Sequence, residues 1–244
     1  MPLYQQVSQS LLRRGQERAG PEQQSPDRES PRRARLNRAE RASLLVAGAA
    51  AAGFCLYGFA TGSPSTVGYV SSVIIIGAAI AWLRRAPLPG LLAPGLAIAA
   101  ISTLAGGLIN VGHDVLYNAS IGPYSNSLGT HYLQYDHLAH AYVSFVVTFA
   151  CWVMLAAPHA GGARSAGRDG RHELVLLAAG AALGLGALNE TVEFLATLAH
   201  HGAHAGGYWN TGWDLVSNFT GVAAAGLVIA RRRAGAAWPA SPQA

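Results

Sequence analysis

Two stretches near the C-terminus decide the fold of this chain: Gly186-Ala-Leu-Asn-Glu190-Thr-Val-Glu193-Phe194 and Trp213-Asp214-Leu-Val-Ser-Asn218-Phe-Thr-Gly221. Together they place four polar side chains inside two segments that are otherwise apolar: the carboxylates of Glu190, Glu193 and Asp214, and the amide of Asn218. Carboxylates at such depth are costly in lipid, and they usually mark a functional site. We therefore expect helices that span a membrane, with a polar site between them.

The overall composition is also that of a membrane protein. Of the 244 residues, 51% are hydrophobic and only 12% are charged, whereas a soluble domain carries about 25% charged residues. The two cysteines, Cys55 and Cys151, lie within apolar runs, so no disulfide or zinc framework is implied. We expect the lipid bilayer to be the main partner of the chain.

Six apolar runs follow one another along the chain. Each is close to the roughly 20 residues that cross about 30 Å of hydrocarbon, and the second is the shortest. The runs cover residues 43–62, 66–83, 91–113, 135–157, 173–199 and 212–230. We predict an all-α polytopic membrane protein with six transmembrane helices.

The basic residues orient these helices. All 17 are arginines, and in a chain with six spans every one of them falls on the same side of the membrane. The positive-inside rule makes that side cytoplasmic. Both termini are therefore expected in the cytoplasm.

The distribution of charge also divides the chain into segments. Residues 1–41 contain nine arginines among many Gln, Ser, Pro and Glu residues, and such a segment cannot bury enough apolar surface to fold alone. We predict a disordered cytoplasmic tail over residues 1–41, a transmembrane domain over 42–232 and a short cytoplasmic tail over 233–244. The first tail is expected to contact anionic lipid rather than nucleic acid.

Five acidic residues gather in the outer half of the membrane under this topology. They are Asp114, Asp136, Glu190, Glu193 and Asp214. Loop 114–134 on the same side is long for a helix connection, which makes it a candidate lid or binding loop. No lysine or arginine lies on this side, so the carboxylates need a proton, a histidine or a metal ion as partner.

Helical spacing groups these side chains into common faces. Asp136 and His140 are four residues apart, and Glu190 and Glu193 are three apart. Asp214, Asn218 and Gly221 form a third stripe. We predict as catalytic residues Glu190, Glu193, His140 and Asp136. The predicted ligands of one divalent metal ion are His140, Glu190, Glu193 and Asp214. The predicted supporting residues are Asn218, Asp114, His113 and Trp213.

Simpler interpretations exist for several of these residues. Asp114 and Asp136 lie near the membrane interface, where either could cap a helix. Asp214 follows Asn210-Thr-Gly-Trp, where an N-cap or first-turn acid is ordinary. Asn218 could simply hydrogen-bond a neighbouring helix. Glu190, Glu193 and His140 are the hardest to explain in this way.

The same residues carry a resemblance to two families. Asp136-x-x-x-His140, Glu190-x-x-Glu193 and the final Trp213-Asp214 helix resemble the YjdF-type bacterial inner-membrane proteins, and the segment from Gly106-Gly107 to His113 fits that type too. The stripe Asp214-x-x-x-Asn218-x-x-Gly221 resembles the VanZ-like family. The resemblance covers about residues 91–230. A VanZ-like protein favours Gln at the position of Glu193, and a YjdF-type protein favours a second acid at the position of Asn218. The YjdF-type resemblance implies a bacterial cytoplasmic (inner) membrane. Neither resemblance implies a particular reaction; the VanZ-like one implies an association with the cell envelope and glycopeptide antibiotics.

Three classes of function remain open from the sequence. The first is a membrane enzyme that uses a metal ion or an acid/base pair on a lipid or another envelope amphiphile. The second is a proton- or metal-coupled transporter, against which we note that the polar residues gather in one half of the membrane. The third is a non-catalytic envelope protein in which the polar cluster fixes helix packing.

Overall fold

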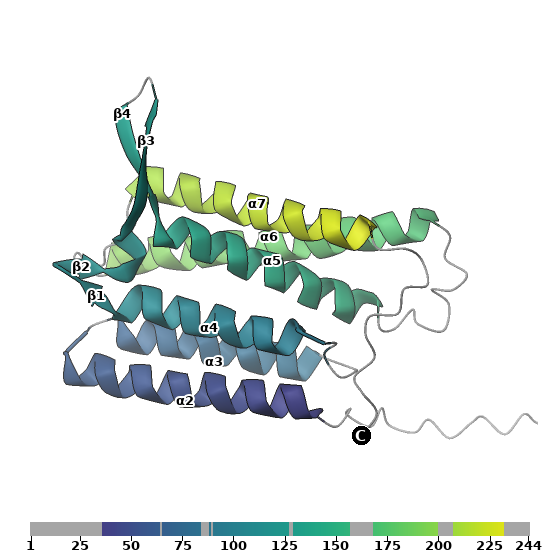
Figure 1. Ribbon diagram of the computed structural model, residues 1–244, viewed down its shortest axis with the longest axis horizontal. Helices are drawn as coiled ribbons and strands as arrows, with labels where there is room; N and C mark the ends of the chain where they lie inside the picture. Colours follow the sequence, from purple (N-terminus) through teal and green to yellow (C-terminus); the bar gives the residue numbers. More distant parts are fainter. Residues whose placement is uncertain are drawn as a thin grey trace, which may run out of the picture. The chain divides into compact units, whose positions relative to one another are not determined.

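The structure is a computed structural model. It describes residues 36–63, 65–83, 88, 90–126, 129–156, 168–199 and 207–231. Residues 1–35 and 232–244, which hold most of the two predicted tails, lie outside this range. Within the described residues each predicted apolar run forms a helix (Figure 1). These are α2 (Arg38–Ala60), α3 (Thr66–Leu83), α4 (Leu92–Leu108), α5 (Tyr135–Ala156), α6 (Arg168–Ala199) and α7 (Gly207–Arg231).

The helices form two groups whose main contact is between α4 and α5. Helices α5, α6 and α7 pack on one another, and α2, α3 and α4 do the same. The groups meet where α4 packs on α5 (Figure 1). An apolar core at the helix ends away from the β-strands joins α4, α5 and α7; it includes Leu92, Phe149 and Ile229.

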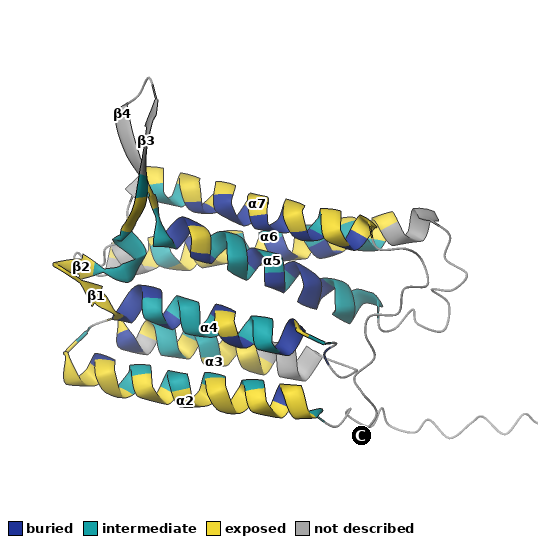
Figure 2. Cartoon of the chain, in the orientation of Figure 1, coloured by how far each residue is buried: buried dark blue, intermediate teal, exposed yellow. Residues whose placement is uncertain are grey.

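The outward faces of the helices are apolar, as a lipid environment requires. Large side chains such as Leu45, Ile75 and Leu176 are 74%, 66% and 72% exposed, and exposed residues follow the outer sides of the helices in Figure 2. Among the described residues, α2, α5, α6 and α7 are long and apolar enough to cross a membrane, while the apolar parts of α3 and α4 are shorter. A multi-pass membrane protein is supported; six spans and the side of the termini remain predictions.

The third helix is shorter than the apolar run that predicted it. Helix α4 ends at Leu108, and β1 (Asn110–Val111) pairs with β2 (Asp114–Val115) across a turn. Gly112 in that turn has a φ of 67°, a left-handed conformation that favours glycine. The prediction that a helix continues to residue 113 is wrong, because hydropathy does not register a backbone reversal inside an apolar stretch.

The long loop that follows is a β-hairpin. After the short 3-10 helix η1 (Leu116–Asn118), β3 (Ser120–Asn126) pairs antiparallel with β4 (Gly129–Gln134). The hairpin extends from the end of the helices at which α5 begins (Figure 1). The all-α prediction therefore misses two small antiparallel sheets. The role of this segment as a lid remains a prediction.

The start of α2 is fixed by a capping box. The Asn37 side chain accepts a hydrogen bond from the Glu40 backbone at 2.9 Å, and the Glu40 carboxylate accepts one from the Asn37 backbone at 2.7 Å. Glu40 also accepts a hydrogen bond from the Leu88 backbone at 2.8 Å, which ties α2 to the segment before α4. The predicted tail boundary at residue 41 therefore lies inside this helix.

Candidate functional site

A stripe of buried polar residues runs along α5 at four-residue spacing. It comprises Asp136, His140, Ser144 and Thr148, which share one helical face because 3.6 residues make a turn. Asp136, Ser144 and Thr148 are buried and His140 is nearly so. The Thr148 hydroxyl donates to the Ser144 backbone carbonyl at 2.7 Å, so it is satisfied within its own helix. The side chains of Asp136, His140 and Ser144 are therefore the ones that can bond to the neighbouring helices.

Helix α7 supplies a matching stripe of Asn210, Asp214 and Asn218. Asp214 is fully buried and Asn218 is 2% exposed. Because α7 begins at Gly207, Asp214 lies in its second turn. The interpretation of Asp214 as an N-cap is therefore wrong. Gly221 continues the stripe and lets the α7 backbone approach α5, since a Cβ there would lie 3.0 Å from the Phe145 backbone nitrogen.

Helix α6 contributes both predicted glutamates. Glu190 is 5% exposed, whereas Glu193 is half-buried. Glu193 accepts a hydrogen bond from the exposed Asn189 side chain at 2.8 Å. The two carboxylates thus lie within one turn of α6 that faces α5.

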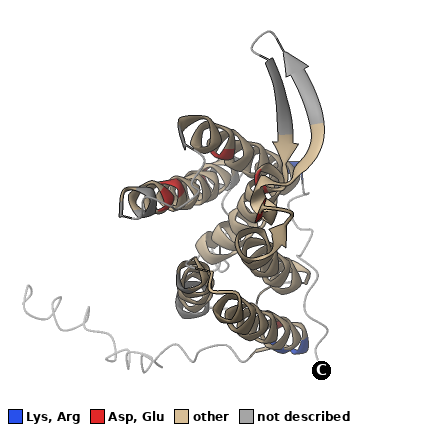
Figure 3. Ribbon diagram, turned by 90° about the vertical axis from the view of Figure 1, so that its left-hand side faces the viewer, with Lys and Arg blue, Asp and Glu red and all other residues tan. Residues whose placement is uncertain are grey.

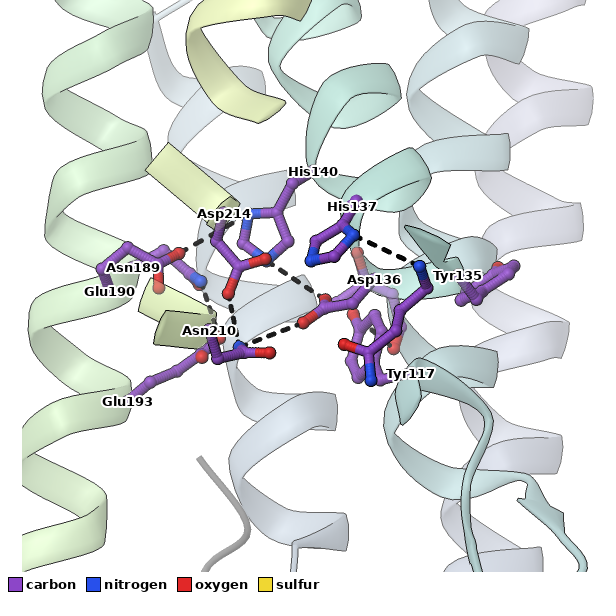
Figure 4. A network of polar contacts seen from close by, with 12 residues as sticks. Tyr117, Tyr135, Asp136, His137, His140, Asn189, Glu190, Glu193, Asn210 and Asp214 are labelled. Carbon is purple, nitrogen blue, oxygen red and sulfur yellow. Dashed lines mark hydrogen bonds and ion pairs between the residues drawn. The ribbon is translucent and has the colours of Figure 1, made fainter. Parts of the chain in front are cut away.

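His140 lies at the centre of the site and touches residues from all three helices (Figure 4). Its Nε2 lies 3.3 Å from Asp136 Oδ1. Its Nδ1 lies 3.5 Å from Glu190 Oε1 and 3.3 Å from Asn218 Oδ1. Asp136, predicted as a possible helix cap, instead directs its carboxylate towards this histidine.

Asn210 was missed from the sequence, yet it connects two of the carboxylates. Its side-chain nitrogen donates to Asp136 Oδ2 at 3.3 Å and to Asp214 Oδ2 at 2.5 Å. The available signal was the spacing of four between Asn210, Asp214 and Asn218. The apolar run hides this spacing, because it places the start of the last helix at residue 212. Ser144, which donates to Asn218 Oδ1 at 2.6 Å, has the same spacing from His140 and was also missed.

Three buried atoms of the site have no hydrogen-bond partner among the described residues: Glu190 Oε1, Asp214 Oδ1 and Asn218 Nδ2. Four carboxylates surround a single histidine here, and no lysine or arginine belongs to this group. Figure 3, a view along the helices, shows that the acidic segments lie on neighbouring helices. Even with His140 protonated, the group carries excess negative charge, which is costly away from water unless a cation or protons balance it.

The donor atoms form two overlapping groups with the spacing of metal ligands. One group is Asp136, His140 and Asp214, and the other is His140, Glu190 and Glu193. In each group, one donor atom from every residue lies within 4.8 Å of the others. A mixed set of carboxylate oxygens and one imidazole nitrogen suits divalent ions such as Zn²⁺, Mn²⁺ or Fe²⁺.

The remaining supporting residues lie outside this cluster. His113 and Asp114 are exposed in the β1–β2 hairpin, so the structure does not bring them to the site. Trp213 packs beside His137, with ring centroids 6.0 Å apart. Both line a lateral cavity of about 230 Å³ between α5 and α7. Leu138 and Val216, which are partly exposed, line the same cavity.

An aromatic cluster supports the start of α5. The Tyr117 ring lies between Tyr69 and Tyr135, at centroid distances of 5.9 and 6.1 Å. Its hydroxyl donates to the Thr103 carbonyl at 3.1 Å, and Tyr135 donates to the Ser102 carbonyl at 3.2 Å. Burial raises the pKa of Tyr117 well above its ordinary value, so this phenol stays protonated as a donor.

Comparison with known proteins identifies the family. A model of the family described as "Predicted membrane protein (DUF2238)" matches residues 42–235. The chain belongs to this family. The matched region contains helices α3 to α7, all but the first residues of α2, and every residue of the polar cluster. No curated protein and no solved structure matches the chain. The YjdF-type and VanZ-like resemblances remain predictions.

Proposed function

We propose that this DUF2238 protein is a metal-dependent membrane enzyme that acts on an envelope amphiphile. The observation that carries the proposal is the fully buried Asp214 carboxylate, whose Oδ1 lacks a hydrogen-bond partner among the described residues. Asp136, His140 and Asp214 each offer one ligand atom, and these three atoms lie within 4.8 Å of one another. A divalent cation would neutralise this arrangement and satisfy the orphaned oxygen.

The hydrogen bonds of Asn210 support Asp136, His140 and Asp214 as the ligands. Asn210 binds the Oδ2 atom of both aspartates. The Oδ1 atom of each therefore remains for a cation, together with His140 Nε2, which lies 3.3 Å from Asp136 Oδ1. Asn210 would then orient two ligands through hydrogen bonds without binding the cation itself.

The opposite edge of His140 supports the same assignment. A metal-binding histidine usually donates its other ring N–H to a carboxylate or carbonyl group. Here Nδ1 lies 3.3 Å from Asn218 Oδ1 and 3.5 Å from Glu190 Oε1, and either oxygen can serve as the acceptor. The tautomer with its proton on Nδ1 leaves the Nε2 lone pair free for a cation. Glu190 and Glu193 then serve as nearby proton acceptors rather than as ligands.

A bound divalent cation would lower the pKa of a coordinated water and polarise a substrate oxygen. The chain's own residues would hold the ligands rigidly through Asn210, accept a proton at Glu190, and exclude bulk water by burial. An acid/base reaction without metal would use the same His140–Glu190 pair. Metal content separates these two mechanisms.

The surroundings of the cluster favour an amphiphilic substrate. The lateral cavity between α5 and α7 is lined mainly by apolar side chains but includes His137 and Ser217, the sequence neighbours of Asp136 and Asn218. Its partly exposed leucine and valine side chains place it on a lipid-facing surface. The polar stripe of α5 ends at Thr148, beside the apolar core, and the next position on that face is Trp152, which packs on the core. The end of the stripe at this level favours an enzyme over a transporter.

The proposal is tested by metal analysis of the purified full chain beside two histidine variants. We expect close to one divalent ion per chain in the wild type, loss of the ion in His140→Ala, and retention in the matched control His137→Ala. His137 is buried too, but it bonds the Gln134 backbone and belongs to neither ligand group. Equal metal content in the two variants, or none in the wild type, would refute the metal assignment.

The enzymatic part needs a separate assay. The wild type and Asp214→Asn would each be incubated with membrane lipid extract and the lipids compared by mass spectrometry. We expect a chelator-sensitive conversion of at least one lipid species by the wild type alone. Identical lipid profiles would leave a metal-binding protein without this activity.

A further inference from the structure

We infer that Asn218 and Glu190 together form a subsite for one neutral hydroxyl group, belonging either to a water molecule or to an alcohol ligand. The inference deepens the proposed function, on which it rests for the idea that a ligand enters the cluster. It does not depend on which residues hold the metal ion. The carrying observation is a pair of complementary buried atoms, the donor Asn218 Nδ2 and the acceptor Glu190 Oε1.

The orientation of Asn218 is fixed by contacts to its oxygen. Oδ1 accepts a hydrogen bond from Ser144 Oγ at 2.6 Å and lies 3.3 Å from His140 Nδ1. With its oxygen engaged by α5, the amide directs Nδ2 towards α6. There it meets Gly186, where an added Cβ would lie 2.8 Å from Nδ2. The absence of a side chain at Gly186 is what leaves room for this amide.

Glu190 brings the acceptor to the same place. It follows Gly186 by four residues on α6, so the two positions share a face about one turn apart. Its Oε1 lies 3.5 Å from His140 Nδ1, the same nitrogen that Asn218 Oδ1 approaches. Donor and acceptor therefore flank one edge of His140. Glu190 is 5% and Asn218 2% exposed, so neither is satisfied by bulk solvent.

The chemistry of the two atoms selects the ligand. A hydroxyl group can accept a hydrogen bond from Asn218 Nδ2 and donate one to Glu190 Oε1 at the same time. An anion would accept from the amide but would be repelled by the glutamate. An ammonium group could donate to Glu190 but has no lone pair for the amide. A hydrocarbon would leave both buried atoms unsatisfied, at the cost of desolvating each.

The experiment uses the full chain in detergent micelles with ¹⁵N-labelled asparagine. The side-chain amide signal of Asn218 is assigned by its loss in Asn218→Asp, which keeps an oxygen for Ser144 but removes the donor. The probes are 1-octanol and octane at equal concentration. We expect octanol to shift this signal saturably and octane to leave it in place.

Two alanine variants on α6 give a matched comparison. Gly186→Ala pushes the Asn218 amide aside and should weaken the octanol response about tenfold, the loss expected for one well-placed hydrogen bond. Gly184→Ala makes the same change two residues earlier, where nothing lies within 4 Å of the new Cβ, and should respond like the wild type. If Gly186→Ala does not fold, Glu190→Leu provides the test. This variant lacks the acceptor, so octanol should no longer shift the Asn218 amide signal.

The outcomes separate the two sources of the hydroxyl group. A saturable octanol shift identifies an alcohol subsite, and a long-lived water cross-peak to the Asn218 amide without an octanol shift identifies a bound water; both support the inference. Neither signal, or an equal shift with octane, would overturn it. Metal content is measured on the same samples. An octanol response in a metal-free chain would refute the proposed metal enzyme while leaving this subsite intact.

Discussion

Replacing Gly221 by alanine tests the packing that brings the two aspartates together. A Cβ at this position would lie far inside van der Waals contact with the Ala141 backbone carbonyl oxygen, and 3.0 Å from the Phe145 backbone nitrogen. Backbone atoms cannot rotate away, so α7 must move from α5. Overpacking of this kind costs up to about 3 kcal/mol, against which the better helix propensity of alanine contributes about 1 kcal/mol. We expect a net loss of about 2 kcal/mol.

Gly212→Ala is the matched control on the same helix. It is exposed, and nothing lies within 4 Å of its added Cβ, so only the propensity gain applies and stability should rise by up to about 1 kcal/mol. Unfolding of both variants in mixed detergent–SDS micelles, followed by circular dichroism, gives the comparison. The two changes should have opposite signs. If Gly221→Ala is as stable as Gly212→Ala, the close α5–α7 contact is wrong.

Three further predictions concern the surroundings of the site. Asn210→Ala should weaken divalent-metal binding by about 10- to 100-fold, as does the loss of a residue that hydrogen-bonds to metal ligands. Asn189→Ala, at an exposed position, should change the affinity little. Calorimetric metal titration compares the two variants, and equal affinities would contradict the role of Asn210. Tyr117→Phe should cost about 1 kcal/mol at neutral pH. Burial raises the folded-state pKa of Tyr117, so the hydroxyl stabilises the fold fully below the unfolded-state pKa of about 10 and less at higher pH. The melting temperatures of wild type and variant should therefore converge above that pH. A constant difference between them would argue against a buried phenol. Reporter fusions after residues 88 and 231 should report the cytoplasm and a fusion after residue 118 the opposite side; a cytoplasmic signal at 118 would contradict six spans.

The helices and their common polar faces could be predicted because both depend on local order. Hydropathy locates an apolar helix without knowledge of its neighbours, and a spacing of three or four residues puts Asp136 with His140 and Glu190 with Glu193 on one face. The structure brings these four residues together with Asp214. The sequence also indicated that these side chains lie close together, because their carboxylates have no lysine or arginine as a partner on that side of the membrane.

The missed features depend on where the backbone turns. The apolar run through residue 113 concealed the turn at Gly112, which carries His113 and Asp114 away from the cluster. The same effect at the start of α7 concealed Asn210, because a helix that begins at Gly207 adds one turn before Asp214. The hydrogen bonds of Asn218 depend on how α5, α6 and α7 cross, and a single helical repeat does not determine that crossing.

Binding of a divalent cation by one ring nitrogen of His140 is the proposal on which the metal-dependent function rests. The most direct measurement is electron–nuclear double resonance of the Mn²⁺-loaded full chain labelled with ¹⁵N-histidine. We predict one strongly coupled histidine nitrogen in the wild type, its persistence in His137→Ala and its loss in His140→Ala. No nitrogen coupling in the wild type, or an unchanged coupling in His140→Ala, would contradict the claim.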